Sequence, residues 1–116
     1  MTIFVTTQFE GLHRWKDAPE ATKFLRYFHR HLFCVRLTIN VKHDDRELEF
    51  FDIKARLQRA IAVVVNKGNT GSCEQIAIKL LNYLHDYFKG RKLTCEVSED
   101  GENGATVYIN EQGEIS

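Results

Sequence analysis

Residues 29–41 alternate between apolar and polar side chains, and this pattern constrains the fold more than any other feature of the chain. The odd positions are His29, His31, Phe33, Val35, Leu37, Ile39 and Val41, and the even positions include Arg30, Arg36, Thr38 and Asn40. Side chains two residues apart in a β-strand lie on the same face of the sheet. The alternation therefore predicts a strand with one buried face, and two histidines lie at the start of that face.

Residues 2–13 alternate in a similar way. Ile3, Val5, Phe9 and His13 share one parity, so a third histidine ends the apolar face of this first segment. If the two segments pair as antiparallel strands, the end of the first lies beside the start of the second. The three histidines then converge at one edge of the core. A β-bulge in either strand would shift the parity and separate them.

Three converging imidazoles are a ligand set that suits zinc. Two histidines two residues apart in a strand can bind one zinc ion together with a third, distant histidine. The fourth coordination position of the zinc then stays open for water or substrate, as in catalytic zinc sites. The alternative interpretation is that these are half-buried strand histidines that hydrogen-bond locally, and the spacing alone does not decide between the two. We predict a zinc site at His13, His29 and His31.

The composition indicates one globular domain, residues 1–116, because 43% of the residues are hydrophobic and the length suffices for one core. The chain has 16 basic and 16 acidic residues and no formal net charge, which argues against nucleic-acid binding. No stretch is apolar enough to span a membrane, and no secretory leader is recognisable. Cys34, Cys73 and Cys95 lack CxxC spacing and fit free thiols in a reducing compartment, so we expect a cytoplasmic protein.

The middle of the chain predicts two helices. Residues 14–27 are expected to form a loop with one helical turn near residues 20–24. A polar turn and a returning strand at residues 47–51 precede the first helix, for which Asp52 is the expected N-cap. Ser72 and Gln75 form a capping box that begins the second helix, which is expected to end at Gly90.

Two short strands, residues 93–98 and 105–109, are expected to close the chain around a polar turn. The order of elements is then ββααββ. An α+β fold satisfies this order, with a four-stranded antiparallel sheet and both helices on one face. Such a sheet has two open edges, so we expect copies of the chain to self-associate.

Five short motifs occur in order along nearly the whole chain. They are Phe9-Glu10-Gly11-Leu12-His13, His29-Arg30-His31, Glu49-Phe50-Phe51-Asp52-Ile53-Lys54, Gly71-Ser72-Cys73-Glu74-Gln75 and Ser98-Glu99-Asp100. They resemble the Phe-x-Ala-x-His, His-Gly-His, Asp-Phe-x-Asp-Leu-Lys, Pro-Thr-x-Glu-Asn and Trp-Glu-Thr motifs of the 6-pyruvoyl tetrahydropterin synthase and 6-carboxytetrahydropterin synthase family. These pterin enzymes have the tunnelling fold, in which subunits pair into barrels.

The resemblance implies roles for individual residues. The three histidines would hold zinc, and Glu99 and Glu74 would belong to the substrate-binding site. Glu99 would bind the aminopyrimidinone edge of a pterin or purine-like ring, because a carboxylate can accept two N–H bonds from such an edge. The resemblance also implies a ring of subunits with the ligand pockets between chains.

The chain departs from the family at its proton-transfer groups. The family's base is a cysteine four residues before His-Gly-His, where this chain has Leu25, and related branches use a glutamate directly before that motif, where this chain has Phe28. The family's Asp-His proton relay between the helices is also missing. We therefore assign no catalytic residue. Cys73 is the better thiol candidate, because a helix start lowers a thiol pKa, and Trp15 is expected to pack against its own loop.

The sequence does not decide between two functions. One is a zinc-dependent lyase of the pterin synthase type with an altered base. The other is a noncatalytic protein that captures a pterin, purine or nucleotide metabolite on the same fold. The missing bases favour the second function, whereas the fold favours the first. In a third interpretation, zinc has only a structural role and stabilises the strands.

Overall fold

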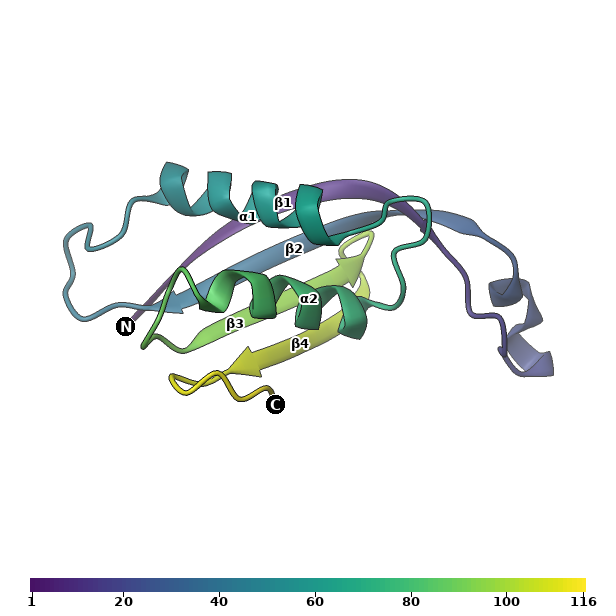
Figure 1. The fold of residues 1–116 in the computed structure, drawn as a ribbon. Coiled ribbons are helices and arrows are strands. Elements are labelled where there is room, and N and C mark those ends of the chain that lie inside the picture. Colours follow the sequence, from purple (N-terminus) through teal and green to yellow (C-terminus); the bar gives the residue numbers. More distant parts are fainter.

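The computed structural model describes residues 1–116 and contains one antiparallel sheet with two helices packed on one of its faces (Figure 1). The four strands lie in sequence order: β1 (Thr2–His13), β2 (His29–Asn40), β3 (Leu93–Glu99) and β4 (Asn103–Ile109). Helices α1 (Phe50–Val64) and α2 (Cys73–His85) lie between β2 and β3 in the chain. The predicted α+β order ββααββ is confirmed, and a short 3-10 helix, η1 (Glu20–Arg26), provides the expected helical turn.

The β1–β2 hairpin is regular along its whole length. Thr2 pairs with Asn40 at one end and His13 pairs with His29 at the other, and no bulge interrupts the register. The parity of the two segments is therefore preserved, and the odd positions face the helices. The hairpin extends beyond the helices toward the η1 segment (Figure 1), and its histidines lie at this end.

The core fills the space between the odd face of the sheet and the two helices. Its largest fully buried side chains include Phe33, Leu37, Ile39, Leu57, Leu80 and Leu84. Each such burial contributes about 1.5–3 kcal/mol. At the hairpin end, the ring of Phe33 lies 5.3 Å from the ring of Phe9 and 5.3 Å from that of His13, measured between centroids. The histidine cluster therefore caps one end of the core.

The expected strand at residues 47–51 is wrong. No strand forms between β2 and α1, and α1 begins at Phe50. Glu49, rather than Asp52, is the N-cap, and its carboxylate accepts the backbone N–H groups of Phe51 and Asp52 at 2.9 and 2.8 Å. A carboxylate at this position pairs two otherwise free helical N–H groups and favours the positive end of the helix dipole.

The predicted capping box at the start of α2 is present. The backbone N–H of Gln75 donates to Ser72 Oγ at 3.2 Å, and the backbone N–H of Ser72 donates to Gln75 Oε1 at 3.0 Å. Gly71 precedes the cap with a φ of 77°, a conformation that favours glycine. The helix ends at His85, before the predicted end at Gly90, and a turn covers the residues between. The cap fixes the carbonyl of Gly71, which contacts the histidine cluster.

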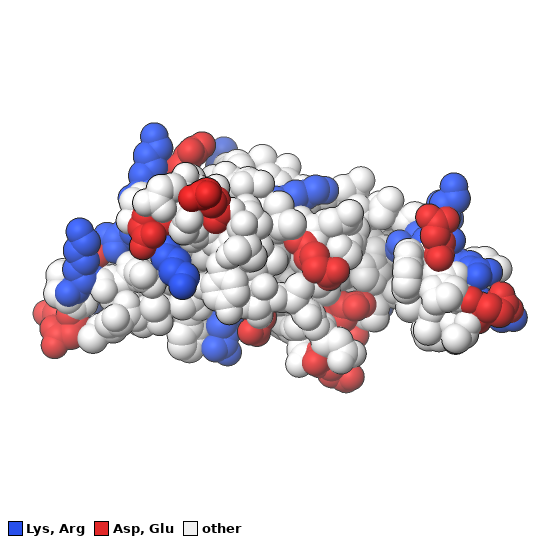
Figure 2. All heavy atoms as spheres, turned by 90° about the horizontal axis from the view of Figure 1, so that it is seen from below, with Lys and Arg blue, Asp and Glu red and all other residues white.

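The two helices are 15 and 13 residues long, and neither is long and apolar enough to cross a membrane. The second face of the sheet carries no helix (Figure 1). Acidic and basic side chains are interspersed along the molecule in Figure 2, and that view shows no continuous basic surface.

Candidate metal centre

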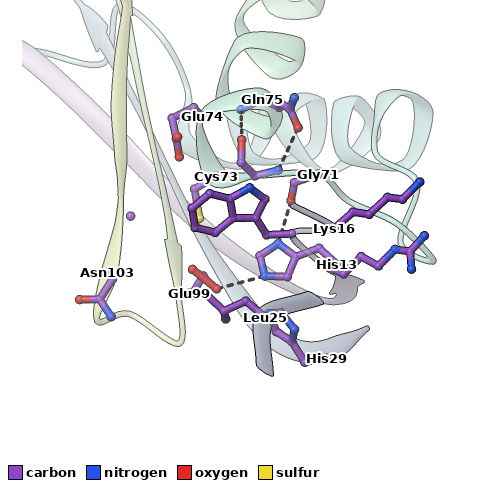
Figure 3. A pocket seen from close by; sticks show the side chains of 14 residues that line it. His13, Lys16, Leu25, His29, Gly71, Cys73, Glu74, Gln75, Glu99 and Asn103 are labelled. Carbon is purple, nitrogen blue, oxygen red and sulfur yellow. Dashed lines mark hydrogen bonds and ion pairs between the residues drawn. The ribbon is translucent and has the colours of Figure 1, made fainter. Parts of the chain in front are cut away.

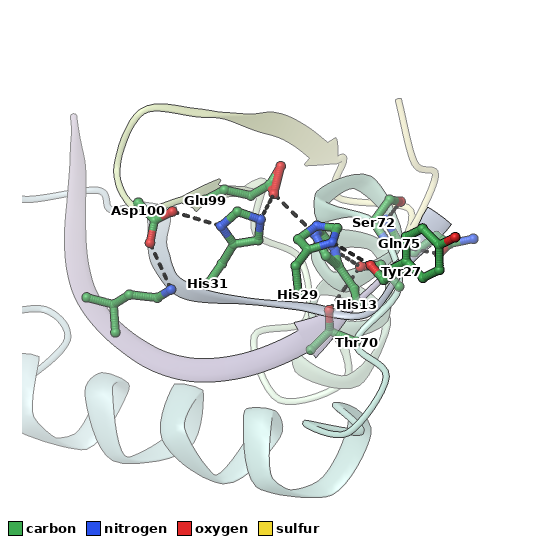
Figure 4. A network of polar contacts seen from close by, with 11 residues as sticks. His13, Tyr27, His29, His31, Thr70, Ser72, Gln75, Glu99 and Asp100 are labelled. Atoms are coloured by element: carbon green, nitrogen blue, oxygen red, sulfur yellow. Dashed lines mark hydrogen bonds and ion pairs between the residues drawn. The ribbon is translucent and has the colours of Figure 1, made fainter. Parts of the chain in front are cut away.

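The three histidines predicted as metal ligands meet at the end of the β1–β2 hairpin (Figure 4). The ring centroids of His13 and His29 are 4.6 Å apart, and the ring of His31 lies 5.1 Å from the first and 4.9 Å from the second. Glu99, the last residue of β3, joins them because β3 pairs with β2 and brings Glu99 opposite Phe33. One ligand atom from each of these four residues lies within 4.8 Å of the others, so the group can hold a metal ion.

Each imidazole is oriented through its Nδ1 atom by an oxygen that can only accept a hydrogen bond. His13 donates to the carbonyl of Gly71 at 2.8 Å, His29 to the carbonyl of Tyr27 at 2.9 Å, and His31 to the carboxylate of Asp100 at 2.8 Å. In a neutral ring the proton then lies on Nδ1, which leaves the lone pair on Nε2. Metal-bound histidines typically make this kind of hydrogen bond through the nitrogen that does not bind the metal.

The Nε2 atoms of His13 and His31 face one carboxylate oxygen. Glu99 Oε2 lies 2.7 Å from His31 Nε2 and 3.2 Å from His13 Nε2. The Nε2 atom of His29 is buried and has no hydrogen-bond partner. A carboxylate oxygen within hydrogen-bond reach of two imidazole nitrogens is joined to them by protons or by a metal ion, and a buried nitrogen without a partner is costly. A bound divalent cation satisfies all four groups.

Two of the distances between ligand atoms are close to those of a zinc site. Zn–N and Zn–O bonds of about 2.0–2.2 Å in a tetrahedron place neighbouring ligand atoms roughly 3.3 Å apart. The 3.2 Å between Glu99 and His13 agrees with this spacing, and the 2.7 Å between Glu99 and His31 needs only a small opening. Three imidazoles and one carboxylate are also ligands that zinc accepts readily.

Asp100 is an ionised partner of His31. The hydrogen bond from His31, and next the backbone N–H of Leu32, hold the pKa of the Asp100 carboxyl below its usual range. The carboxylate therefore accepts the Nδ1–H of His31 at neutral pH. Asp100 did not emerge from the sequence as a site residue. Its position directly after Glu99 was visible there, but its contact with His31 depends on the pairing of β2 with β3.

A pocket of about 700 Å³ opens beside the cluster (Figure 3). Its wall contains His13, His29, Glu99 and Glu74, together with a segment after β1 that contributes Arg14, Trp15, Lys16 and Leu25. Both residues implied in ring binding, Glu99 and Glu74, thus lie in one wall with two of the histidines. Trp15 keeps 54% of its surface exposed and lines the pocket, so the expectation that it packs against its own loop is wrong.

This chain has no proton-transfer group at the two positions where the family that it resembles carries a base. Leu25 lines the pocket with His29, and Phe28 is 48% exposed. Cys73 also lines the pocket, but burial, reinforced by the charges of Glu99 and Glu74, raises the pKa of its thiol to about 12. The expectation of a lowered thiol pKa at this helix start is wrong, because desolvation outweighs the helix dipole.

No protein-family model matches the chain, and no curated protein sequence matches it. The function is therefore inferred from the chemistry of the site.

Proposed function

We propose that this is a zinc-binding protein of the 6-pyruvoyl and 6-carboxytetrahydropterin synthase type that recognises a pterin or purine-like ring beside the metal. The observation that carries the proposal is the convergence of three histidine side chains and one carboxylate beside a pocket, whose wall contains all of them except His31. Zinc would be held by His13, His29 and His31, with Glu99 beside it. When bound, zinc supplies Lewis acidity toward an oxygen of the ligand.

Glu99 suits the recognition of a ring edge that donates hydrogen bonds. Both of its contacts with the histidines are made by Oε2, which leaves Oε1 to accept an N–H group from a ligand. Glu74 lies in the same pocket wall and supplies a second carboxylate. The exposed indole of Trp15 offers an aromatic surface for a flat ring. A ligand with an aminopyrimidinone edge matches these groups.

The variant Glu99→Gln tests ring recognition. We expect the zinc-loaded parent to bind pterin and guanine analogues in calorimetry, and we expect the variant to bind them about 10- to 100-fold more weakly. The reason is that a hydrogen bond to a charged group contributes about 1.5–3 kcal/mol. The zinc content of both proteins is measured in the same samples, so that a loss of metal is not mistaken for a loss of ring binding.

Glu96→Gln is the matched control, because Glu96 is exposed on the same strand and lies outside the pocket. It should leave the affinity unchanged. Equal affinities for parent and Glu99→Gln would reject the proposed anchor, and a parent that holds zinc but binds neither analogue would reject the proposed ligand class.

A second candidate function is a noncatalytic protein that captures a pterin, purine or nucleotide metabolite. The specific observation in its favour is the pocket wall itself, where Leu25 stands beside His29 and the thiol of Cys73 has a pKa of about 12. A rearrangement of the ligand needs an acid or base within hydrogen-bond reach of the reacting atoms. Turnover measurements separate the two functions and are treated in the Discussion.

We also propose that copies of the chain associate through the edges of the sheet. β1 forms one edge and is 12 residues long, so it exposes a row of backbone groups that can pair with another strand. At the opposite edge, Tyr108 of β4 already exchanges backbone hydrogen bonds with Ser116. Light scattering should give a mass at least twice the 13.5 kDa of the chain. A monomer at micromolar concentration would contradict this prediction.

All three cysteines are free thiols. This fits a reducing compartment, and we propose the cytoplasm as the location of the protein.

A further inference from the structure

Asp100 adopts a backbone conformation that residues with a side chain rarely adopt. It follows β3 directly, and its φ of 58° lies in the left-handed region. Glycine occupies this region at little cost, whereas other residues are strained there, asparagine and aspartate less than most. Such strain persists only where the surrounding contacts enforce it, and it often marks a functional position.

Three hydrogen bonds tie Asp100 to two consecutive residues of β2. Its backbone N–H donates to the carbonyl of Leu32 at 2.7 Å, and the N–H of Leu32 donates to Asp100 Oδ1 at 3.0 Å. The other carboxylate oxygen, Oδ2, accepts the Nδ1–H of His31 at 2.8 Å (Figure 4). Each oxygen of the carboxylate therefore takes one N–H donor.

We propose that Asp100 is a positioning residue that holds His31 in the tautomer and orientation required for metal binding. The inference rests on the proposed zinc site. The other two histidines are held by the backbone carbonyls of Gly71 and Tyr27, which no side-chain substitution removes. Only the Nδ1 hydrogen bond of His31 is made to a side chain. A carboxylate partner also makes the imidazole more basic and thus a stronger ligand.

An asparagine at position 100 separates this role from a purely structural one. Asparagine tolerates a positive φ at least as well as aspartate, so the turn itself is preserved. Its side chain, however, has one acceptor oxygen for the two N–H donors of Leu32 and His31. If the amide nitrogen faces His31, it donates to Nδ1 and moves the ring proton to Nε2, the atom that would bind the metal.

The experiment measures zinc affinity by competition with a chromophoric chelator, and thermal unfolding of the metal-free proteins, for the parent, Asp100→Asn and Asp100→Gly. We expect both variants to bind zinc about 10- to 100-fold more weakly, as is typical when a partner of a metal-bound histidine is lost. We expect their metal-free unfolding midpoints to fall only slightly, because the hydrogen bonds that they lose are solvent-exposed and neither residue strains the turn. Glu102→Gln removes an exposed charge from the same turn and should change neither quantity.

Several results would overturn the inference. If the parent binds zinc and Asp100→Asn binds it equally well, Asp100 does not position His31, although the zinc site itself stands. If both variants lose zinc affinity together with a much lower unfolding midpoint, and the spectrum of the cobalt-substituted Asp100→Asn protein equals that of the parent, Asp100 only stabilises the turn. A parent that binds no zinc would overturn the proposed function and this inference with it. The visible spectrum of the cobalt-substituted parent and Asp100→Asn gives an independent readout, since only a change at the ligands alters it.

Discussion

Replacing His29 by alanine should abolish stoichiometric zinc binding in a protein that we otherwise expect to carry about one zinc per chain. The Nε2 atom of His29 is buried without a hydrogen-bond partner, and its Nδ1 is fixed by the carbonyl of Tyr27. One ring nitrogen of His29 is therefore free to join the cluster of ligand atoms. Removing it leaves two imidazoles and one carboxylate, so the variant loses one metal–nitrogen bond and should hold zinc too weakly to retain it through purification. Elemental analysis of the purified variant measures the loss.

His43→Ala is the control for this result. His43 lies in the exposed connection after β2, where its nearest charged partner is Glu47 at 3.9 Å. The His43→Ala variant should contain as much zinc as the parent. His29 begins β2 and is not part of the buried core, so the metal-free variant should unfold at nearly the same temperature as the metal-free parent. A His29→Ala protein with as much zinc as the parent would show that the metal lies elsewhere.

The convergence of the three histidines could be predicted because it depends only on local rules. Two alternating segments, a connection between them and antiparallel pairing suffice to bring His13 beside His29, provided that neither strand carries a bulge. The observed register fulfils this condition from Thr2 to His13. The capping box at Ser72 and Gln75 is local in the same sense, since all of its hydrogen bonds join residues within one turn.

The contacts that join distant segments could not be predicted. Glu99 lies among the histidines because β3 pairs with β2 in one particular register, and the sequence carries no signal for that register. Asp100 reaches His31 for the same reason. The expected low pKa of the Cys73 thiol was wrong because desolvation depends on which elements pack over the thiol. The strand expected at residues 47–51 failed because its alternation does not correspond to a buried face, as the exposure of Phe50 and Phe51 shows.

The zinc-loaded protein should convert dihydroneopterin triphosphate very slowly or not at all, although it binds the ring. Leu25 and Phe28 occupy the positions of the two known bases of the resembling family and cannot transfer protons, and a thiol with a pKa of about 12 does not replace them at neutral pH. The loss of one positioned base typically lowers the rate about 10²- to 10⁴-fold. Ring binding should survive, because the proposed anchor, Glu99, is a different residue from the missing bases. Chromatographic detection of product under single-turnover conditions, with calorimetry on the same sample, checks both parts.

Leu25→Cys tests whether the missing base limits the reaction. Leu25 lines the same pocket as His29, so a thiol there would stand in a wall that contains a proposed metal ligand, and a metal ion close to a thiol lowers its pKa. We expect this variant to exceed the rate of the parent, and Leu25→Ala, which opens the same space without a thiol, to give no gain. Robust turnover by the parent would instead mean that another group performs the proton transfer. Glu74 would then be the first residue to replace, because it is the second carboxylate in the pocket wall.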